Sequence, residues 1–150
     1  MGHTFANLLV HVIFGTKERQ PTIQDSFRRR LHAYMIGLGR GEFGDVVRVG
    51  GTTDHVHGLI ALRTDVSVAE AMRKWKSVSS KWVKDTFAEG GGFAWQSGYA
   101  AFSVSPSNAD EVKAYIENQV EHHRTRTFEE EFIAFLKRHN VPYDPEHVWD

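Results

Sequence analysis

The order of β-rich and amphipathic segments along the 150 residues is the feature that most constrains the fold. Residues 4–14 are rich in apolar and β-branched types, which predicts a strand buried on both faces. Residues 22–38 repeat apolar side chains at helical spacing, and a glycine-rich stretch at 37–44 ends that helix. Two short strands are expected over residues 46–49 and 56–62, joined by a hairpin turn. The first part of the chain therefore predicts the order β-α-β-β.

The second part of the chain adds a helix, a strand and two further helices. Residues 67–87 carry a stripe of apolar side chains at steps of three and four, which predicts a helix packed on the core. Residues 93–104, with their spaced aromatic side chains, predict a fourth strand. A third helix follows, and Ser107 and Asp110 have the spacing of a capping box at its start. A last helix is expected over residues 128–138.

The complete order, β-α-β-β-α-β-α-α, predicts an α+β protein. Its first six elements match the ferredoxin-like (RRM-like) split β-α-β arrangement, in which two helices pack on one face of a four-stranded antiparallel sheet. We expect one domain over residues 1–150, with residues 128–150 as a helical and irregular C-terminal extension. The second face of the sheet must then be covered by other segments or used for binding.

Composition excludes several classes of protein. The chain contains no cysteine, which excludes disulfides, a cysteine nucleophile, iron–sulfur clusters and cysteine-bound zinc. No stretch approaches the roughly 18 apolar residues of a membrane span. The first basic residue is Lys17, which argues against the charged start of a signal peptide. We therefore expect a cytoplasmic protein with no membrane partner.

The formal net charge of −1 counts against a nucleic-acid partner, but the charge is distributed unevenly. Residues 1–104 contain 13 Lys and Arg against 9 Asp and Glu, a charge of +4. Residues 105–150 contain 5 against 10, a charge of −5. The simplest interpretation is a basic body with a solvated acidic tail, and the alternative is that the basic body binds an anionic partner.

His55 and His57 are the sharpest local signal. Residues two apart on a strand point to the same face, so both imidazoles would project side by side from an outward face while Val56 points into the core. Such a pair can bind one divalent ion if a third ligand comes from elsewhere. Asp54 could cap the turn or accept a hydrogen bond from one imidazole. Two exposed polar residues without a metal are the alternative.

Tyr115 and Gln119 form the second signal. They lie four apart on the expected third helix, which places their side chains one above the other on one face. A tyrosine in this position commonly packs in a core, but a buried glutamine amide needs polar partners. The Gln119 oxygen could bind a hard metal, and a nearby cation would favour the phenolate form of Tyr115.

The expected helix over residues 67–87 supplies positive charge. Arg73, Lys76 and Lys84 fall at helical steps and form one ridge opposite the tryptophans. A solvated helix face is the default interpretation, and a track for phosphates is the competing one. The candidate DNA-binding residues of this helix and of the segment after the first strand are Arg73, Lys74, Lys76, Lys81, Lys84, Lys17 and Arg19.

A His-x-His strand, a Tyr-x-x-x-Gln helix and a basic ridge on a ferredoxin-like scaffold together resemble the HUH superfamily of single-strand DNA nucleases. Within it, the chain is similar to the single-tyrosine transposases of the 200/605 group of insertion sequences. The segments that carry the resemblance are residues 9–14, 16–19, 53–60, 95–99, 102–104, 115–119 and 128–131.

The resemblance implies specific roles. His55, His57 and Gln119 would bind Mg²⁺ or Mn²⁺, and Tyr115 would attack a DNA phosphate to give a 5′-phosphotyrosine link and a free 3′-hydroxyl. The implied substrate is single-stranded DNA with hairpin ends, processed at the bacterial nucleoid. The implied assembly is a homodimer in which the tyrosine helix of one chain can complete the site of the other. The acidic extension after residue 128 is longer than the family core, so the resemblance gives it no role.

Two other functions stay open at this point. A non-catalytic RRM-like module would stack nucleic-acid bases on exposed aromatic side chains of the sheet, although the central strand carries His55 and His57 there instead. A histidine-ligated hydrolase of small substrates would leave the ridge between Arg73 and Lys84 without a role.

Overall fold

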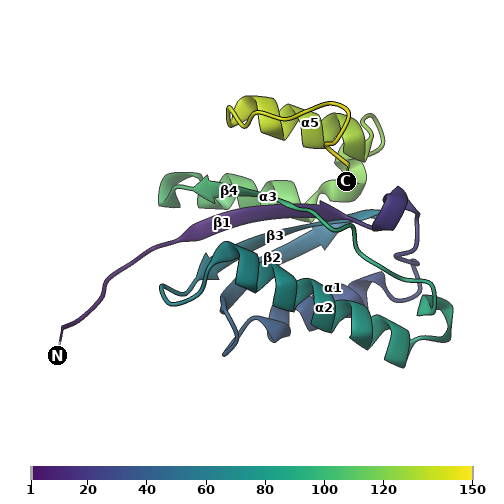
Figure 1. Ribbon diagram of the computed structural model, residues 1–150, viewed down its shortest axis with the longest axis horizontal. Helices are drawn as coiled ribbons and strands as arrows, with labels where there is room; N and C mark the ends of the chain where they lie inside the picture. The colour runs from purple at the N-terminus through teal and green to yellow at the C-terminus, as the bar shows by residue number, and fades with distance from the viewer. Residues whose placement is uncertain (1, 150) are drawn as a thin grey trace.

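A four-stranded antiparallel sheet separates two layers of helices in the computed structural model, which describes residues 2–149 (Figure 1). The strands are β1 (Leu9–Gly15), β2 (Gly44–Gly51), β3 (His55–Leu62) and β4 (Ala100–Val104), in the order β2-β3-β1-β4. The α-helices are α1 (Arg28–Leu38), α2 (Val68–Thr86), α3 (Ala109–Glu117), α4 (Gln119–His122) and α5 (Phe128–Arg138). Short 3₁₀ turns are η1 (Lys17–Arg19), η2 (Ala88–Gly90) and η3 (Pro106–Asn108). The predicted α+β, ferredoxin-like class is confirmed.

Helices α1 and α2 cover one face of the sheet, as expected (Figure 1). Alternate residues of β1 and β3 point into this layer, and Trp75 of α2 lies at its centre with its indole N–H bonded to the carbonyl of Met35, 2.9 Å away. The main core consists of Val12, Phe14, Val56, Ile60, Leu31, Met35, Met72, Trp75 and neighbouring apolar side chains. The predicted stripe of α2 is thus buried where the spacing places it.

Helices α3 and α5 lie on the other face of the sheet (Figure 1). A second cluster forms there between sheet residues Ile13, Ala100 and Phe102 and the α5 residues Phe128, Phe132, Phe135 and Leu136. Thr127 and Glu130 close a full capping box at the start of α5, so this helix stabilises its own N-terminus. The second face is therefore covered, in part by α5 of the C-terminal extension.

Several element boundaries differ from the sequence prediction. The fourth strand is limited to Ala100–Val104, because the preceding segment makes only an isolated bridge between Thr16 and Trp95. The capping box expected at Ser107 and Asp110 is wrong: the N-cap of α3 is Asn108, without a side-chain cap. The Ser107 hydroxyl instead bonds that of Ser105 at 3.0 Å.

The third helix is also interrupted. Asn118, with φ −100° and ψ 26°, ends α3 one residue before α4 begins at Gln119. Tyr115 and Gln119 therefore lie on consecutive helices rather than on one. In the described part of the chain, no helix is long and apolar enough to cross a bilayer.

Gly50 allows α3 to approach the sheet closely. It pairs with His57 across β2 and β3, and a Cβ atom added to it would lie 2.0 Å from the backbone oxygen of Ile116. That oxygen belongs to the helix that carries Tyr115. A glycine at position 50 thus sets the distance between the tyrosine helix and the strand of the two histidines.

Substitution of Gly50 tests this close approach. We expect Gly50→Ala to lower the free energy of unfolding by about 1–3 kcal/mol, because backbone atoms must move to accept the methyl group. Gly37→Ala is the matched control, since a Cβ there meets nothing within 4 Å, and alanine favours a helix interior. Urea unfolding of both variants measures the difference, and equal stability would contradict the close packing.

Candidate active site

His55 and His57 start β3 and lie on the face of the sheet opposite to the main core. Their imidazoles share one face, as the spacing predicts, with ring centroids 5.3 Å apart, and Val56 points into the main core. The expectation of an outward face is wrong, because both side chains are 0% exposed. Helices α4 and α5 supply the groups that cover them, including Gln119 and Glu131.

A chain of hydrogen bonds links His57 to the tyrosine. His57 Nδ1 lies 2.8 Å from His11 Nε2, and His57 Nε2 lies 2.8 Å from Glu131 Oε1. The second carboxylate oxygen of Glu131 accepts a hydrogen bond from the Tyr115 hydroxyl. Burial lowers the pKa of His57 to about 4 against the opposing effect of Glu131, so the ring is neutral at pH 7. We therefore assign its proton to Nε2, facing Glu131.

His55 is held from both sides. Its Nδ1 lies 2.8 Å from Asp54 Oδ1, and its Nε2 lies 2.8 Å from Gln119 Oε1. Both partner atoms are acceptors, and which ring nitrogen carries a proton depends on the tautomer. With the proton at Nδ1, His55 Nε2 and Gln119 Oε1 would both offer lone pairs to a cation.

The side chains fit a small divalent cation. His55, His57 and Glu131 form a group whose ligand atoms all lie within 4.8 Å of one another. An octahedral ion with ligands at about 2.1 Å needs neighbouring ligand atoms about 3 Å apart. Glu131 Oε1 lies 2.8 Å from His57 Nε2 and 3.6 Å from His55 Nε2, which suits such a polyhedron. Imidazole, amide and carboxylate ligands do not by themselves select one metal.

Glu131 carries the negative charge at the centre of the site. Burial alone would raise the pKa of its carboxyl group, but His123, His57 and Tyr115 hold that pKa well below its usual range. His123 Nε2 lies 3.2 Å from Glu131 Oε1, and the carboxylate raises the pKa of His123 against the effect of burial. Glu131 is thus ionised at neutral pH and surrounded by partners.

Tyr115 is half-buried on α3, with its ring stacked on His122 at a centroid distance of 4.3 Å. Burial, the hydrogen bond to Glu131 and the charge of that carboxylate raise the pKa of the phenol. Its proton therefore stays on the tyrosine oxygen in this arrangement. Activation as a nucleophile requires this hydrogen bond to change.

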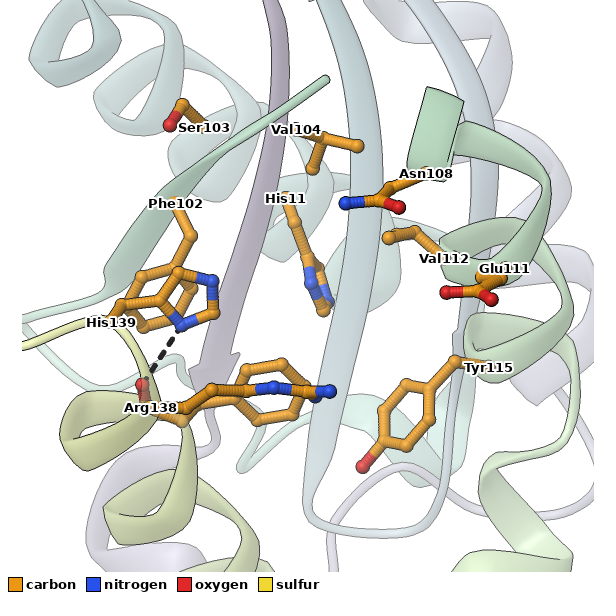
Figure 2. Close-up of a pocket in the computed structure, with 11 residues that line it drawn as sticks. His11, Phe102, Ser103, Val104, Asn108, Glu111, Val112, Tyr115, Arg138 and His139 are labelled. Carbon is orange, nitrogen blue, oxygen red and sulfur yellow. Dashed lines mark hydrogen bonds between the residues drawn. The ribbon is translucent and has the colours of Figure 1, made fainter. Parts of the chain in front are cut away.

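A cavity of about 300 Å³ opens beside Tyr115 (Figure 2). His11 projects into it from β1, and Phe102 and His139 line the opposite side, with their rings stacked at 4.2 Å. Arg138, in the last turn of α5, extends into the same space towards Tyr115. The cavity thus joins aromatic faces and a cation to the candidate nucleophile.

The basic residues of α2 do not lie at this site. They belong to the helical layer on the other side of the sheet (Figure 1). Three of them have partners: Lys74 pairs with Glu42, Lys81 pairs with Asp85, and Lys76 donates to the carbonyls of Ser97 and Gly98.

Lys76 departs from the solvent-facing ridge that the sequence predicts. Burial lowers its pKa to about 8. Arg73 and Lys84 are exposed, as the ridge requires. DNA binding by these side chains stays a prediction.

Lys17 and Arg19 lie closer to the histidines. They form η1 directly after β1, where the backbone N–H of Thr16 donates to the carbonyl of Asp54 at 2.8 Å. The Arg19 guanidinium lies 4.8 Å over the ring of Trp149, and Lys17 is exposed. These two cations are therefore placed at the His55 end of the sheet.

Sequence reasoning missed Glu131, His11 and His123 as members of the site. Glu131 had a signal: it falls within the apolar stripe of Phe128, Phe132 and Phe135, where a carboxylate is buried and needs partners. His11 alternates with the core residues of β1 and so shares the face of His57. No comparable pattern singles out His123.

Comparison with known proteins gives the family. The family model described as "Transposase IS200 like" matches residues 4–119, which include both histidines, Tyr115 and Gln119. The chain belongs to the IS200-like transposase family. The match ends before α5, so Glu131 lies outside the residues that the family model covers.

Solved structures with this fold include members of the same class. The crystal structure of a candidate transposase from Deinococcus radiodurans R1 is 22% identical, with a TM-score of 0.61, over 79% of this chain and 96% of that one. A REP-associated tyrosine transposase bound to a REP hairpin is 12% identical, with a TM-score of 0.55, over 77% and 68%. No curated protein matches the sequence. The structural likeness confirms the fold of this IS200-like chain.

The raised pKa of Tyr115 gives a testable consequence. We expect the phenol absorbance change to occur well above pH 10 in the difference between the native protein and Tyr115→Phe. Because the folded-state pKa exceeds that of the unfolded chain, this group's stabilising contribution is complete below about pH 10 and is lost as pH rises further. Ultraviolet titration measures the shift, and a transition at the ordinary tyrosine value would refute the hydrogen-bonded, buried phenol.

Proposed function

We propose that this chain is a metal-dependent DNA transposase that cuts and rejoins single-stranded DNA through a covalent bond to Tyr115. The observation that carries the proposal is the meeting of the Tyr115 hydroxyl with the buried group of His55, His57 and Glu131. Membership of the IS200-like family supports the reaction class. The hairpin-bound REP-associated structure supports a hairpin-forming DNA as substrate.

The reaction needs a tyrosine oxygen, a phosphate and a leaving 3′-oxygen in line. The Tyr115 oxygen attacks phosphorus and loses its proton to solvent, while the bond to the 3′-oxygen breaks and that oxygen takes up a proton. The product is a 5′-phosphotyrosine and a free 3′-hydroxyl, and the reverse step at a new junction restores the phosphodiester. A divalent ion, when bound, supplies charge neutralisation of the phosphate and favours the phenolate.

The side chains of this protein would bind the metal ion and orient the DNA strand. Gln119, His55 and His57 would hold the ion, with Mg²⁺ or Mn²⁺ as the proposed metal, and Asp54 fixes the His55 ring through its Nδ1. The strand next to the scissile phosphate would approach Tyr115 from the side on which His11 lines the cavity. Lys17 and Arg19 would contact backbone phosphates at the other end of the site.

The candidate catalytic and metal-binding residues come together within one chain, which limits the role that a homodimer would have. Tyr115 and Gln119 reach the histidines of their own chain, with Gln119 Oε1 at 2.8 Å from His55 Nε2. One copy can therefore supply the whole constellation. Dimerisation stays a prediction, and its role would be to pair two DNA ends rather than to complete a site.

The RRM-like binding module fits the structure less well. Such a module needs an open sheet face with aromatic side chains that stack on bases. Within residues 2–149, helices α3, α4 and α5 cover the face of His11 and His57, and both histidines are at most 2% exposed. The small-substrate hydrolase, which would turn over without covalent attachment, is distinguished by the adduct measurement that follows.

Covalent attachment tests the nucleophile. We expect the protein with Mn²⁺ or Mg²⁺ to form an adduct with a hairpin-bearing single-stranded oligonucleotide, visible as a shifted band on a denaturing gel. Tyr115→Phe should abolish the adduct, because no other group replaces the attacking oxygen. Tyr34→Phe is the matched control on α1, in the opposite layer, and should leave attachment unchanged. Persistent adduct with Tyr115→Phe would reject the assignment.

The contribution of the α2 ridge is tested by salt dependence. We expect hairpin affinity to fall steeply with salt, and the double variant Arg73→Ala and Lys84→Ala to reduce the log–log slope by about 2, one unit for each lost phosphate contact. Arg40→Ala, an exposed arginine in the connection to β2, is the control. A slope that stays the same would remove the ridge from the DNA interface.

A further inference from the structure

The carboxylate of Glu131 fills the centre of the site from a helix outside the family match. One oxygen lies 2.8 Å from His57 Nε2, 3.2 Å from His123 Nε2 and 3.6 Å from His55 Nε2. The other oxygen accepts the hydrogen bond of Tyr115. A single anionic group thus contacts the candidate metal ligands and the candidate nucleophile at the same time.

A scissile phosphate would need these same contacts. In the proposed reaction, one phosphate oxygen must approach the cation held by the histidines, and the phosphorus must lie next to the Tyr115 oxygen. The Glu131 carboxylate is negatively charged like a phosphate. One of its oxygens faces the histidines, and the other faces the Tyr115 hydroxyl. Glu131 and His55 are 0% exposed, and Gln119 is 1% exposed, so the site has no room for DNA with α5 in place.

We propose that Glu131 occupies the position of the scissile phosphate and that α5 is an autoinhibitory cap that must leave the site before DNA enters. The inference rests on the proposed function. Exchange of one anion for another keeps the charge balance near His57 and His123 unchanged. The buried carboxylate, costly to leave unpaired, is released to water at the same step.

The construction of α5 suits a separable cap. Its own capping box satisfies its first turn, so the helix does not depend on the sheet for its N-terminus. A short connection at residues 123–127 joins it to α4. Its contacts with the sheet are apolar side chains around Phe132 and Phe135, together with the polar contacts of Glu131. Withdrawal would therefore expose the cluster on β4 without breaking a strand pairing.

Substitution of Glu131 by its neutral isostere tests the proposal. In a Tyr115→Phe background, which binds without cleavage, we expect Glu131→Gln to tighten binding of a hairpin-bearing single-stranded oligonucleotide by about tenfold, because a larger fraction of molecules is open. With Tyr115 intact, Glu131→Gln should form the covalent adduct faster. Glu130→Gln is the matched control, an exposed glutamate on the same helix whose place in the capping box glutamine can also fill, and it should change neither value.

A distance measurement in the protein with Glu131 intact tests the movement itself. The chain has no cysteine, so spin labels at Lys137→Cys on α5 and Glu70→Cys on α2 report one distance, and both positions are exposed. The metal in this experiment is Mg²⁺, because paramagnetic Mn²⁺ would disturb the spin-label signal. We expect the distance between the two labels to increase when the oligonucleotide is added. An unchanged distribution in a DNA-bound sample would overturn the cap.

The results distinguish failure of the cap proposal from failure of the proposed function. If the unsubstituted protein forms the adduct and Glu131→Gln forms it no faster or more slowly, Glu131 is a required site residue and the cap proposal is rejected alone. If no variant binds or attaches DNA, the proposed function fails and the cap fails with it. Thermal unfolding of Glu131→Gln checks that the fold is kept, and Glu131→Asp, which retains the charge on a shorter side chain, should stay closer to the unsubstituted protein.

Discussion

The burial of polar side chains between the sheet and α5 is the constraint on which the site depends. His11, His55, His57, Gln119 and Glu131 are all at most 2% exposed, on a face that would otherwise be an ordinary apolar surface. Buried polar groups must be partnered, because an unpaired one costs about 1–3 kcal/mol. Each member of the set therefore fixes the position of the next.

Alternate residues of β3 face the main core and the candidate active site. Val56 and Ile60 point into the main core with Trp75, whereas His55 and His57 point towards α5. The apolar face is buried in the main core. The polar face carries the carboxylate that the proposed cap would exchange for a phosphate. A single strand thus has one face buried in the core and one face with ionisable groups that a substrate could contact.

The sequence could predict the arrangement of β3 because a period of two is a local property. The position of His55 and His57 on one face follows from it. Their burial could not be predicted, since the cover comes from α5, about 70 residues later in the chain. The acidic tail was expected to be solvated, and Glu130 is indeed exposed. Glu131 differs only through its place in the apolar stripe, so its role depends on tertiary packing that charge counting does not record.

Proton positions connect the metal, His11 and α5. In this structure, the His57 Nε2–H donates a hydrogen bond to Glu131, and His57 Nδ1 accepts one from His11 Nε2–H. To bind a cation through Nε2, His57 must carry its proton at Nδ1 instead, and His11 must then accept it. Both imidazoles change tautomer together, and Glu131 loses a hydrogen bond as they do. A cation at His55 and His57 would therefore weaken one of the contacts that hold α5 over the site, and the proposed opening would be coupled to metal binding through the same pair of rings.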